Sequence, residues 1–273
     1  IILLLLDRNR KKQLLQEKQL EDTNKMEQYK IYGELLHTYA YLAKEGDKFI
    51  EVENYYTNEQ LRIPLDVRYS AIDNATRYFN KYTKYKRTKE ALCVHLLETQ
   101  HTIEHLESIE NALSLAQDAN DLAVIRQEMF EFGYIKKQFS SKNGKAKHTK
   151  IAKTRPLHYV TASGFHIYVG KNNYQNDEIT FKMATGNDWW FHAKKIPGSH
   201  VLVKTEGNEL PDDVFVIAAQ LAGYYSSGKE NEKLEVDYLQ KKNVKKPAGA
   251  LPGFVVYYTN FSMMVHPQIT DVT

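Results

Sequence analysis

Residues 187–201 read Asn187-Asp188-Trp189-Trp190-Phe191-His192-Ala193-Lys194-Lys195-Ile196-Pro197-Gly198-Ser199-His200-Val201. This stretch holds both tryptophans of the chain, together with an acid, two histidines and a Pro-Gly pair. Aromatic residues favour extended backbone and Pro-Gly favours a tight turn, so we predict a strand, a turn and a second strand that begins near His200. The turn, formed by Pro197 and Gly198, should place Ser199 and both histidines at one rim of a sheet. Because side chains alternate between the faces of a strand, we also expect at least one tryptophan to be buried.

The composition is that of a folded, soluble chain. Its 273 residues are enough for two domains, and 42% hydrophobic with 12% aromatic residues is enough for a packed core. The net charge of +3 is too small to identify a partner, so the placement of the charges matters more. The single cysteine, Cys93, fits a reducing cytosol without excluding secretion. The apolar opening, residues 1–6, is too short for a membrane span or a secretory signal, and we expect it to start a helix in a chain that begins inside a larger protein.

Two polar helical segments flank a compact insert in the first half of the chain. Residues 7–29 are almost wholly charged or amide, and a helix this polar needs a partner. The partner is predicted after Lys86, where apolar residues recur at spacings of mostly three and four: Leu92, Leu96, Ile103, Leu106, Ile109, Leu113 and Ala116. The two segments predict an antiparallel coiled-coil hairpin, for which a plain spacer arm is the alternative interpretation.

The insert, residues 29–85, differs from its flanks in composition. It contains ten of the nineteen tyrosines. Residues 49–52 and 61–64 predict a β-hairpin, and a helix capped by Asp66 or Ser70 should follow. We therefore expect a small folded tip on the arm. Its tyrosines either fill a core or form a contact surface for a wet, charged partner.

A basic segment follows the arm. A helix that begins at Asn120 or Asp121, one of which should cap it, is expected to end at Gly133. No acid occurs between Glu131 and Asp177, whereas nine cations do: Lys136, Lys137, Lys142, Lys145, Lys147, Lys150, Lys153, Arg155 and Lys171. Residues 136–156 therefore predict a flexible basic linker, and the excess of cations favours a polyanionic partner over mere solvation.

The rest of the chain alternates with period two and is punctuated by glycine, which predicts an α+β domain on a largely antiparallel sheet. The expected elements are a hairpin of residues 159–161 and 165–169, a short helix 178–184, strands at 189–191 and 201–203, a helix 212–225 and strands 254–258 and 263–265. The predicted domain organisation is an arm at 1–135, the linker at 136–156 and the α+β domain at 157–273.

The polar groups of the opening stretch also raise an enzyme or metal hypothesis. Ser199 does not lie in a Gly-x-Ser-x-Gly turn, so a hydrolase is disfavoured. His192 and His200 lack the spacing, and the accompanying Cys or His pair, of a zinc site. The glycines are isolated in turns, which disfavours a nucleotide-binding loop. We expect no catalytic residue, no metal ligand and no cofactor.

A binding surface for RNA accounts for these residues better. Aromatic rings stack on bases, amides bond to base edges or sugar hydroxyls, and lysines neutralise phosphates. The predicted RNA contacts are Lys171, Asn172, Asn173, Asn176, Asp188, Trp189, His192, Lys194, Ser199, His200, Lys245 and Lys246. The predicted phosphate contacts of the linker are Lys142, Lys145, Lys147, Lys150 and Arg155.

Several ordered motifs resemble one known family. The motifs that resemble its NFACT-R domain are Gly170-Lys171-Asn172-Asn173 with Gln175-Asn176-Asp177, Asp188-Trp189-Trp190-Phe191-His192-Ala193-Lys194, Ile196-Pro197-Gly198-Ser199-His200-Val201, and Val244-Lys245-Lys246-Pro247 with Pro252-Gly253-Phe254. Upstream, Tyr32-Gly33-Glu34-Leu35-Leu36, Ile63-Pro64-Leu65-Asp66 and Asn74-Ala75 with Tyr78-Phe79 and Tyr82 look like the coiled-coil and middle region of NFACT proteins.

This resemblance implies a cytoplasmic role in ribosome-associated quality control. It implies binding to a large ribosomal subunit blocked by peptidyl-tRNA, recruitment of alanyl-tRNA and support of template-free alanine tailing. The family's N-terminal domain and helix-hairpin-helix element are not expected in these residues, so the chain should bind without completing the cycle. The same family is reported as cell-surface adhesins for fibronectin or fibrinogen that lack a signal peptide, which is the second hypothesis.

Overall fold

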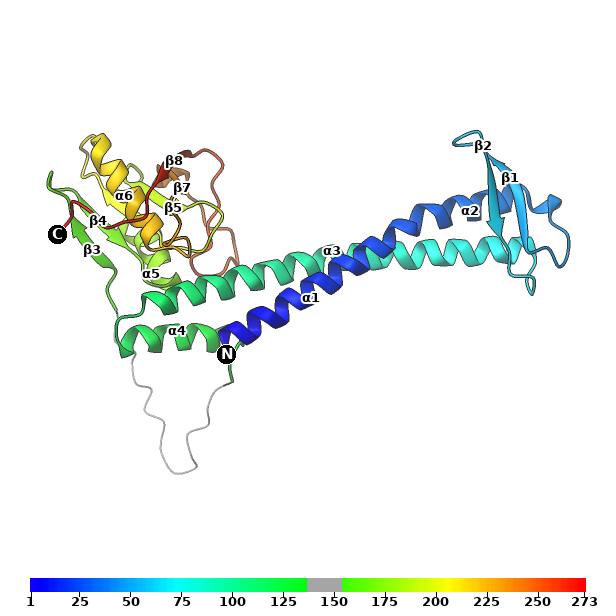
Figure 1. Ribbon diagram of the computed structural model, residues 1–273, viewed down its shortest axis with the longest axis horizontal. Helices are drawn as coiled ribbons and strands as arrows, with labels where there is room; N and C mark the ends of the chain where they lie inside the picture. The colour runs from blue at the N-terminus through cyan, green and yellow to red at the C-terminus, as the bar shows by residue number, and fades with distance from the viewer. Residues whose placement is uncertain (137–153) are drawn as a thin grey trace, which may run out of the picture. The chain divides into compact units, whose positions relative to one another are not determined.

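The computed structural model describes residues 1–136 and 154–273 (Figure 1). It has a long helical hairpin region at the N-terminal side, followed by an α+β domain with a six-stranded sheet, which confirms the predicted fold class. The chain divides into two compact units, residues 7–102 and residues 1–6 with 103–273. Within the described ranges, no helix is both long and apolar enough to span a membrane.

The helical hairpin comprises α1 (Ile2–Asp22), α2 (Met26–Thr38) and α3 (Ala71–Leu115), with a 3-10 turn at Thr23–Lys25. Gln13 of α1 donates a hydrogen bond to Gln100 of α3 at 2.9 Å. Gly33 of α2 faces the ring of Phe79 on α3, where an added Cβ would lie only 2.9 Å from the ring. The predicted second leg and the helix expected within the insert are one continuous helix, α3, on which Cys93 is exposed.

The predicted tip is a folded hairpin on helices. β1 (Phe49–Asn54) and β2 (Glu59–Pro64) pair antiparallel, and Asn58 takes the positive φ that the turn between them requires. The core of this part contains Leu35, Leu36, Ile50, Val52, Ile63, Ala75 and Tyr78. Ser70 accepts a hydrogen bond from the Asp73 N–H and so caps α3, as one of the two predicted alternatives. Tyr78 packs its ring in this core and donates its hydroxyl to Pro64 O at 2.7 Å.

The second unit begins with a helical core. Residues 1–6, the end of α3 and α4 (Ala119–Glu131) bury Ile2, Leu6, Ile103, Leu106, Ile109, Ala112, Ile125 and Met129 together. The cap of α4 is Asp118 and not Asn120 or Asp121, because Asp118 has extended backbone and its side chain accepts hydrogen bonds from the N–H groups of Asn120 and Asp121. Gly133, with φ 73°, follows the end of α4 as predicted.

The sheet is antiparallel throughout and has the strand order β3-β4-β6-β5-β7-β8. Its strands are β3 (Leu157–Val160), β4 (His166–Val169), β5 (Trp189–Ala193), β6 (Val201–Lys204), β7 (Leu234–Gln240) and β8 (Phe261–Val265). Helix α6 (Asp212–Tyr224) covers one face. In β5, Phe191 points toward α6, whereas Trp190 points to the other face and packs with Leu239 and Val244. Phe191 and Trp190 are fully buried, and the burial of Trp190 confirms the prediction that at least one tryptophan is buried.

Two predicted elements differ from the structure. Residues 254–258 form no strand apart from one bridge between Val256 and Lys245, because Val255 and Tyr257 instead cover Trp190 and Leu239. The helix predicted at 178–184 begins earlier: α5 (Asn173–Glu178) is capped by Asn172 and continues into a π-helical turn, Ile179–Met183. Strand β7 was missed, since its acids interrupt the apolar alternation.

Candidate functional site

The loop between β4 and α5 is held by a close backbone approach. An added Cβ on Gly170 would meet the backbone nitrogen of Asn176 at 2.9 Å, so glycine is required there. Asn172 then caps α5, because its side-chain oxygen accepts a hydrogen bond from the Gln175 N–H at 3.0 Å. This geometry turns Lys171, Asn172, Asn173 and Asn176 inward, and all four are buried.

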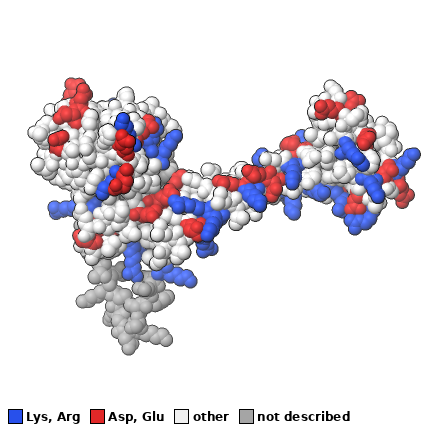
Figure 2. All heavy atoms as spheres, in the orientation of Figure 1, with Lys and Arg blue, Asp and Glu red and all other residues white. Residues whose placement is uncertain are grey.

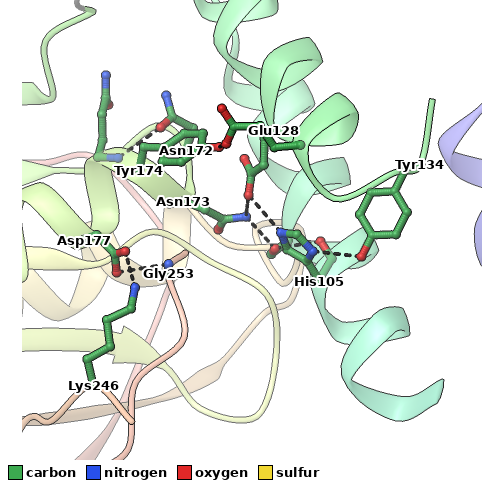
Figure 3. Close-up of polar contacts among 12 residues, drawn as sticks. His105, Glu128, Tyr134, Asn172, Asn173, Tyr174, Asp177, Lys246 and Gly253 are labelled. Carbon is green, nitrogen blue, oxygen red and sulfur yellow. Dashed lines mark hydrogen bonds and ion pairs between the residues drawn. The ribbon is translucent and has the colours of Figure 1, made fainter. Parts of the chain in front are cut away.

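Asn173 joins the loop to α3 and α4 of the same unit through a buried carboxylate (Figure 3). Its amide nitrogen donates to Glu128 Oε1 and to Ser108 Oγ, each at 2.8 Å. The same Glu128 oxygen lies 2.9 Å from His105 Nε2, and His105 Nδ1 lies 2.9 Å from the hydroxyl of Tyr134. Burial and the nearby carboxylate raise the pKa of Tyr134 to about 12, so its hydroxyl keeps its proton at neutral pH.

One ion pair and one hydrogen bond reinforce this connection between the loop and α4. Lys171 Nζ lies 2.8 Å from Asp121 Oδ2, and both side chains are almost wholly buried. The hydroxyl of Tyr174 donates to Glu131, and burial followed by this bond raises the pKa of Tyr174 above its ordinary value. The polar residues of the loop therefore hold the last domain against α3 and α4.

His200 lies in a second buried network, on the Trp190 side of the sheet. Its Nδ1 is 2.8 Å from Thr180 Oγ1, which also accepts the indole N–H of Trp190 at 3.2 Å. Its backbone N–H donates to Asn176 Oδ1 at 3.0 Å. With 2% of its surface exposed, His200 lies in the interior and not at the predicted rim.

The two histidines of the opening stretch are neutral at physiological pH. Burial lowers the pKa of His200 well below its ordinary value, and the neighbouring His192 lowers it further. Burial also lowers the pKa of His192 to about 4, against the opposing effect of Asp237. Neither ring therefore provides a cation for phosphate.

Asp188 fixes the start of β5. Its oxygens accept hydrogen bonds from the backbone N–H of Thr185 at 2.7 Å and of Thr205 at 3.0 Å, from the hydroxyls of the same two threonines, and from Lys204 Nζ. Burial favours the protonated carboxyl, but these donors outweigh it and the pKa of Asp188 is lowered. The carboxylate is thus charged, buried and fully engaged by the protein.

The Pro197-Gly198 corner packs against the end of α6. Gly198 forms an antiparallel bridge with Ser226, whose Cβ would lie 3.0 Å from a Cβ added to Gly198. The Ser199 N–H donates to Tyr225 O at 2.9 Å, while its side-chain oxygen is buried and has no hydrogen-bond partner within the described residues. The corner therefore directs Ser199 inward. The prediction that Ser199 and His200 contact RNA stays a prediction. In the structure, the backbone N–H of Ser199 and both the ring and the backbone N–H of His200 form hydrogen bonds within the protein and so help to hold the fold.

The remaining predicted contacts reach solvent to differing extents. Trp189, His192 and Lys194 are partly buried, and Lys194 pairs with Glu235 at 2.6 Å. Lys246 pairs with Asp177, whose other oxygen accepts the Gly253 N–H at 3.1 Å (Figure 3). Lys245 and Arg155 are exposed. The linker residues Lys142, Lys145, Lys147 and Lys150 lie outside the described residues.

A cleft that the sequence did not reveal lies beside Trp189. Its volume is about 650 Å³, and its lining includes Trp189, Gln240, Asn243, Tyr258, Asn260 and Phe261. We call it the aromatic cleft. The signal that accompanies it in the sequence is a second stretch without acids, between Asp237 and Asp271, that contains Lys241, Lys242, Lys245 and Lys246.

A basic segment of α3 was also missed. No acid occurs between Asp73 and Glu90, whereas six exposed cations do: Arg77, Lys81, Lys84, Lys86, Arg87 and Lys89. Elsewhere in the helical region the two signs of charge lie side by side, as the face drawn in Figure 2 shows. Within the described part of the chain, Lys84, Lys86, Arg87 and Lys89 form no ion pair. We call residues 77–89 the basic segment.

The described residues contain no group of three or more His, Cys, Asp or Glu side chains arranged to hold a metal ion.

The chain is similar to known bacterial proteins in both sequence and structure. Rqc2 homolog RqcH of Streptococcus suis is 40% identical over 96% of this chain, and RqcH of Bacillus subtilis is 36% identical over 94%. The chain spans 46% and 44% of the length of these two relatives. The solved C-terminal part of the fibronectin/fibrinogen-binding protein from Streptococcus suis aligns with a TM-score of 0.74 and 35% identity, over 98% of this chain and 91% of that one.

Two family models match the chain in succession. Residues 4–150 match the model of the NFACT N-terminal and middle domains, and residues 153–256 match that of the NFACT protein RNA binding domain. Since the first of these alone matches more than half of the residues, this chain belongs to the NFACT family.

Proposed function

We propose that this chain is the RNA- and ribosome-binding half of a ribosome-associated quality-control factor. In this proposal it binds obstructed large ribosomal subunits and tRNA in the cytoplasm and supports C-terminal alanine tailing of stalled chains. The kinship with RqcH and the match of residues 153–256 to an RNA-binding domain support the class of function. The chain contributes binding and no catalytic group.

One structural observation carries the RNA part of the proposal, namely the basic segment of α3. Its six cations are exposed, and no carboxylate of the same segment competes for them. An isolated lysine on a helix is usually only solvated, but consecutive turns with cations and no acid suit a track of phosphates. Tyr78, which lies among these cations, is buried in the core of the tip, and Tyr82 and Tyr85 are partly buried, so the segment offers charge and little base readout.

The test is cosedimentation of the chain with purified large subunits over a series of salt concentrations. Replacing Lys84, Arg87 and Lys89 by Gln should weaken binding and lower the slope of log affinity against log salt by roughly 0.7 to 0.9 per lost phosphate contact. The matched control replaces Lys12, Lys18 and Lys25, which are equally exposed but lie among acids of the same unit. The control should leave the slope unchanged. Equal effects of the two triple variants, or binding indifferent to salt, would contradict the proposal.

A second candidate is an adhesin for fibronectin or fibrinogen at the cell surface. It is favoured by one observation, the likeness to the solved fibronectin/fibrinogen-binding protein of Streptococcus suis. Binding of the chain to immobilised fibronectin in physiological salt, retained after the triple change in the basic segment, would support this activity. Competition between fibronectin and large subunits would place both on one surface.

A further inference from the structure

The aromatic cleft has a rigid ring wall. Trp189 packs edge-on against Phe215 of α6, with ring centroids 4.7 Å apart, and its ring also lies 5.9 Å from that of Tyr238. Phe261 lies 5.5 Å from Tyr238 on the neighbouring strand. Because these rings support one another from the core side, their free faces are held in place for a ligand.

Two of the cleft's aromatic side chains are exposed far beyond what packing requires. Tyr258 exposes 86% of its surface and Phe261 exposes 62%. They follow one another closely at the approach to β8 and line the cleft together with Trp189. Large apolar rings grouped at a cleft mark a binding site more often than an idle surface.

The cleft also holds unused polar groups. Within the part of the chain that the structure describes, the side-chain amides of Gln240 and Asn243 and the indole N–H of Trp189 form no hydrogen bond. The amide nitrogen of Asn260 reaches Phe261 O and Ser262 Oγ, each at 3.3 Å, which leaves its oxygen as an acceptor. Donors and acceptors beside flat rings match the edge of a nucleobase.

The chain segment that supplies most of the cleft's lining is basic. The segment that supplies Gln240, Asn243, Tyr258 and Phe261 has no acid from residue 238 to residue 270. Of its four lysines, Lys242 and Lys245 are exposed and form no ion pair with any described residue. A phosphodiester backbone would complement this charge, whereas a neutral peptide or sugar would leave it unused.

We propose that the aromatic cleft binds an unpaired nucleobase of single-stranded RNA. The base stacks on Trp189 between Tyr258 and Phe261, Gln240 and Asn243 bond to its edge, and the flanking phosphates lie near Lys242 and Lys245. This assignment rests on the proposed RNA-binding function and gives it a ligand: a single-stranded segment with an accessible base, not a duplex. The volume of about 650 Å³ is that of a small-ligand site.

Intrinsic fluorescence provides the test, with the whole 273-residue chain and short single-stranded RNA oligomers as the probe. Trp190 is fully buried, so a base that enters the cleft quenches Trp189 alone. Tyr258→Ala should weaken binding at least about fivefold, the lower range for loss of one stacked ring. Tyr41→Ala is the matched control, since Tyr41 is 77% exposed but lies in the other unit. A Trp190→Phe background should retain the quenching, and Trp189→Phe should remove it.

Each outcome decides between the two proposals. Quenching by single-stranded but not duplex RNA, sensitive to Tyr258 and not to Tyr41, supports the cleft. RNA binding that persists without quenching, or with unchanged affinity in Tyr258→Ala, overturns the cleft and leaves the proposed function standing. A polar peptide of equal length that quenches Trp189 while RNA does not also overturns it. Failure of the unaltered chain to bind any RNA refutes the proposed function itself.

Discussion

Glu128 is the residue on which the buried contacts of α5, α3 and α4 converge. Its carboxylate has no exposed surface, and one oxygen is shared by the amide of Asn173 and the ring of His105. A carboxylate withdrawn from water in this way is tolerated only while hydrogen-bond donors replace the solvent. The stability of the junction therefore depends on a small set of donors from three elements.

Glu128→Ala should destabilise the unit by roughly 1 to 3 kcal/mol, because it leaves the buried His105 Nε2 without its partner and Asn173 with Ser108 Oγ as its remaining acceptor. Gln127→Ala is the matched control on the same helix: Gln127 is exposed and bonds only to Glu131 of its own helix, so its loss should change stability by less than about 1 kcal/mol. Urea unfolding followed by tryptophan fluorescence measures both variants. Similar losses for the two substitutions would show that the buried contacts are not what holds the junction.

The neutral histidines predict an acid-sensitive fold. In the unfolded chain a histidine titrates near 6.5, whereas the pKa of native His200 is well below that value and that of native His192 is about 4. Below pH 6.5 the unfolded chain therefore binds protons that the native chain does not, so stability falls as pH falls. The loss is about 1.4 kcal/mol per pH unit for each such histidine, and for His192 it continues to about pH 4.

His200→Gln should reduce the pH dependence of the free energy of unfolding by the contribution of one histidine, about 1.4 kcal/mol per pH unit. The measurement is the free energy of unfolding in urea between pH 7 and pH 5. His266→Gln serves as the control, since His266 is exposed and forms no hydrogen bond, ion pair or ring contact with any described residue. A pH slope that is equal in the wild type and in His200→Gln would refute the assignment of a neutral, buried His200.

At the scale of elements, the sequence predicted those strands that show a local alternation of apolar and polar residues. It did not predict those elements whose polar residues are satisfied by partners far away in the chain. The hairpins expected at 49–64 and 159–169 and the strands around Pro197-Gly198 were predicted because each is encoded by nearby residues, although the first strand of the second hairpin begins two residues earlier, at Leu157. Strand β7 was missed because Asp237 looks like a surface residue, yet in the fold it accepts from Tyr257 and Ser262. The early start of α5 was missed for the same reason, since its buried amides are satisfied by residues far away in the chain.

The candidate site shows the same limit. Trp189 was predicted to contact RNA because of its aromatic ring and its polar neighbours in the sequence; that contact stays a prediction, and the structure places Trp189 in the lining of the aromatic cleft. The other walls come from the end of β7 and the approach to β8, which only the sheet order brings beside β5. Conversely, the amides predicted to face RNA proved to be buried, because a polar side chain looks the same in sequence whether water or protein satisfies it.

The close approach of α2 and α3 gives a prediction for the tip. Gly33→Val should destabilise residues 7–102 by roughly 1 to 3 kcal/mol, since a β-branched side chain must displace the ring of Phe79. His37→Val is the control: it introduces the same side chain on the same helix without the clash, because His37 is exposed, and histidine and valine have similar helix propensities. Thermal unfolding followed by circular dichroism compares them. A stability of Gly33→Val equal to that of the control would mean that the ring moves aside freely.

The contribution of the linker cations to RNA binding can be tested by removing their charge, although these residues lie outside the described ranges. Replacing Lys142, Lys145, Lys147 and Lys150 by Gln should lower the salt dependence of tRNA binding by roughly 0.7 for each lost single-strand contact. Base preference should not change, since lysines that meet phosphates read no sequence. Filter binding to tRNA at several salt concentrations measures the slope. An unchanged slope would remove these lysines from the RNA-binding surface.

At the scale of the whole molecule, the two compact units have separate cores. The core around Ile63 and Tyr78 belongs to residues 7–102, and the sheet core belongs to the other unit. Both tryptophans lie in the sheet, so their fluorescence reports on that unit alone, whereas circular dichroism reports on both. Gly33→Val should therefore lower the transition seen by circular dichroism and leave the transition seen by fluorescence in place. A shift of both transitions together would mean that the units unfold as one.

The exposed thiol on α3 makes the chain ready for spectroscopy without engineering. Cys93 is the chain's single cysteine, is exposed, and lies in residues 7–102, whereas both tryptophans lie in the other unit. A maleimide dye that accepts tryptophan emission would therefore attach at one position in residues 7–102 and receive energy from the two adjacent tryptophans of the other unit. This energy transfer would follow, in real time, how the separation of the two units responds when a large ribosomal subunit or an RNA oligomer binds.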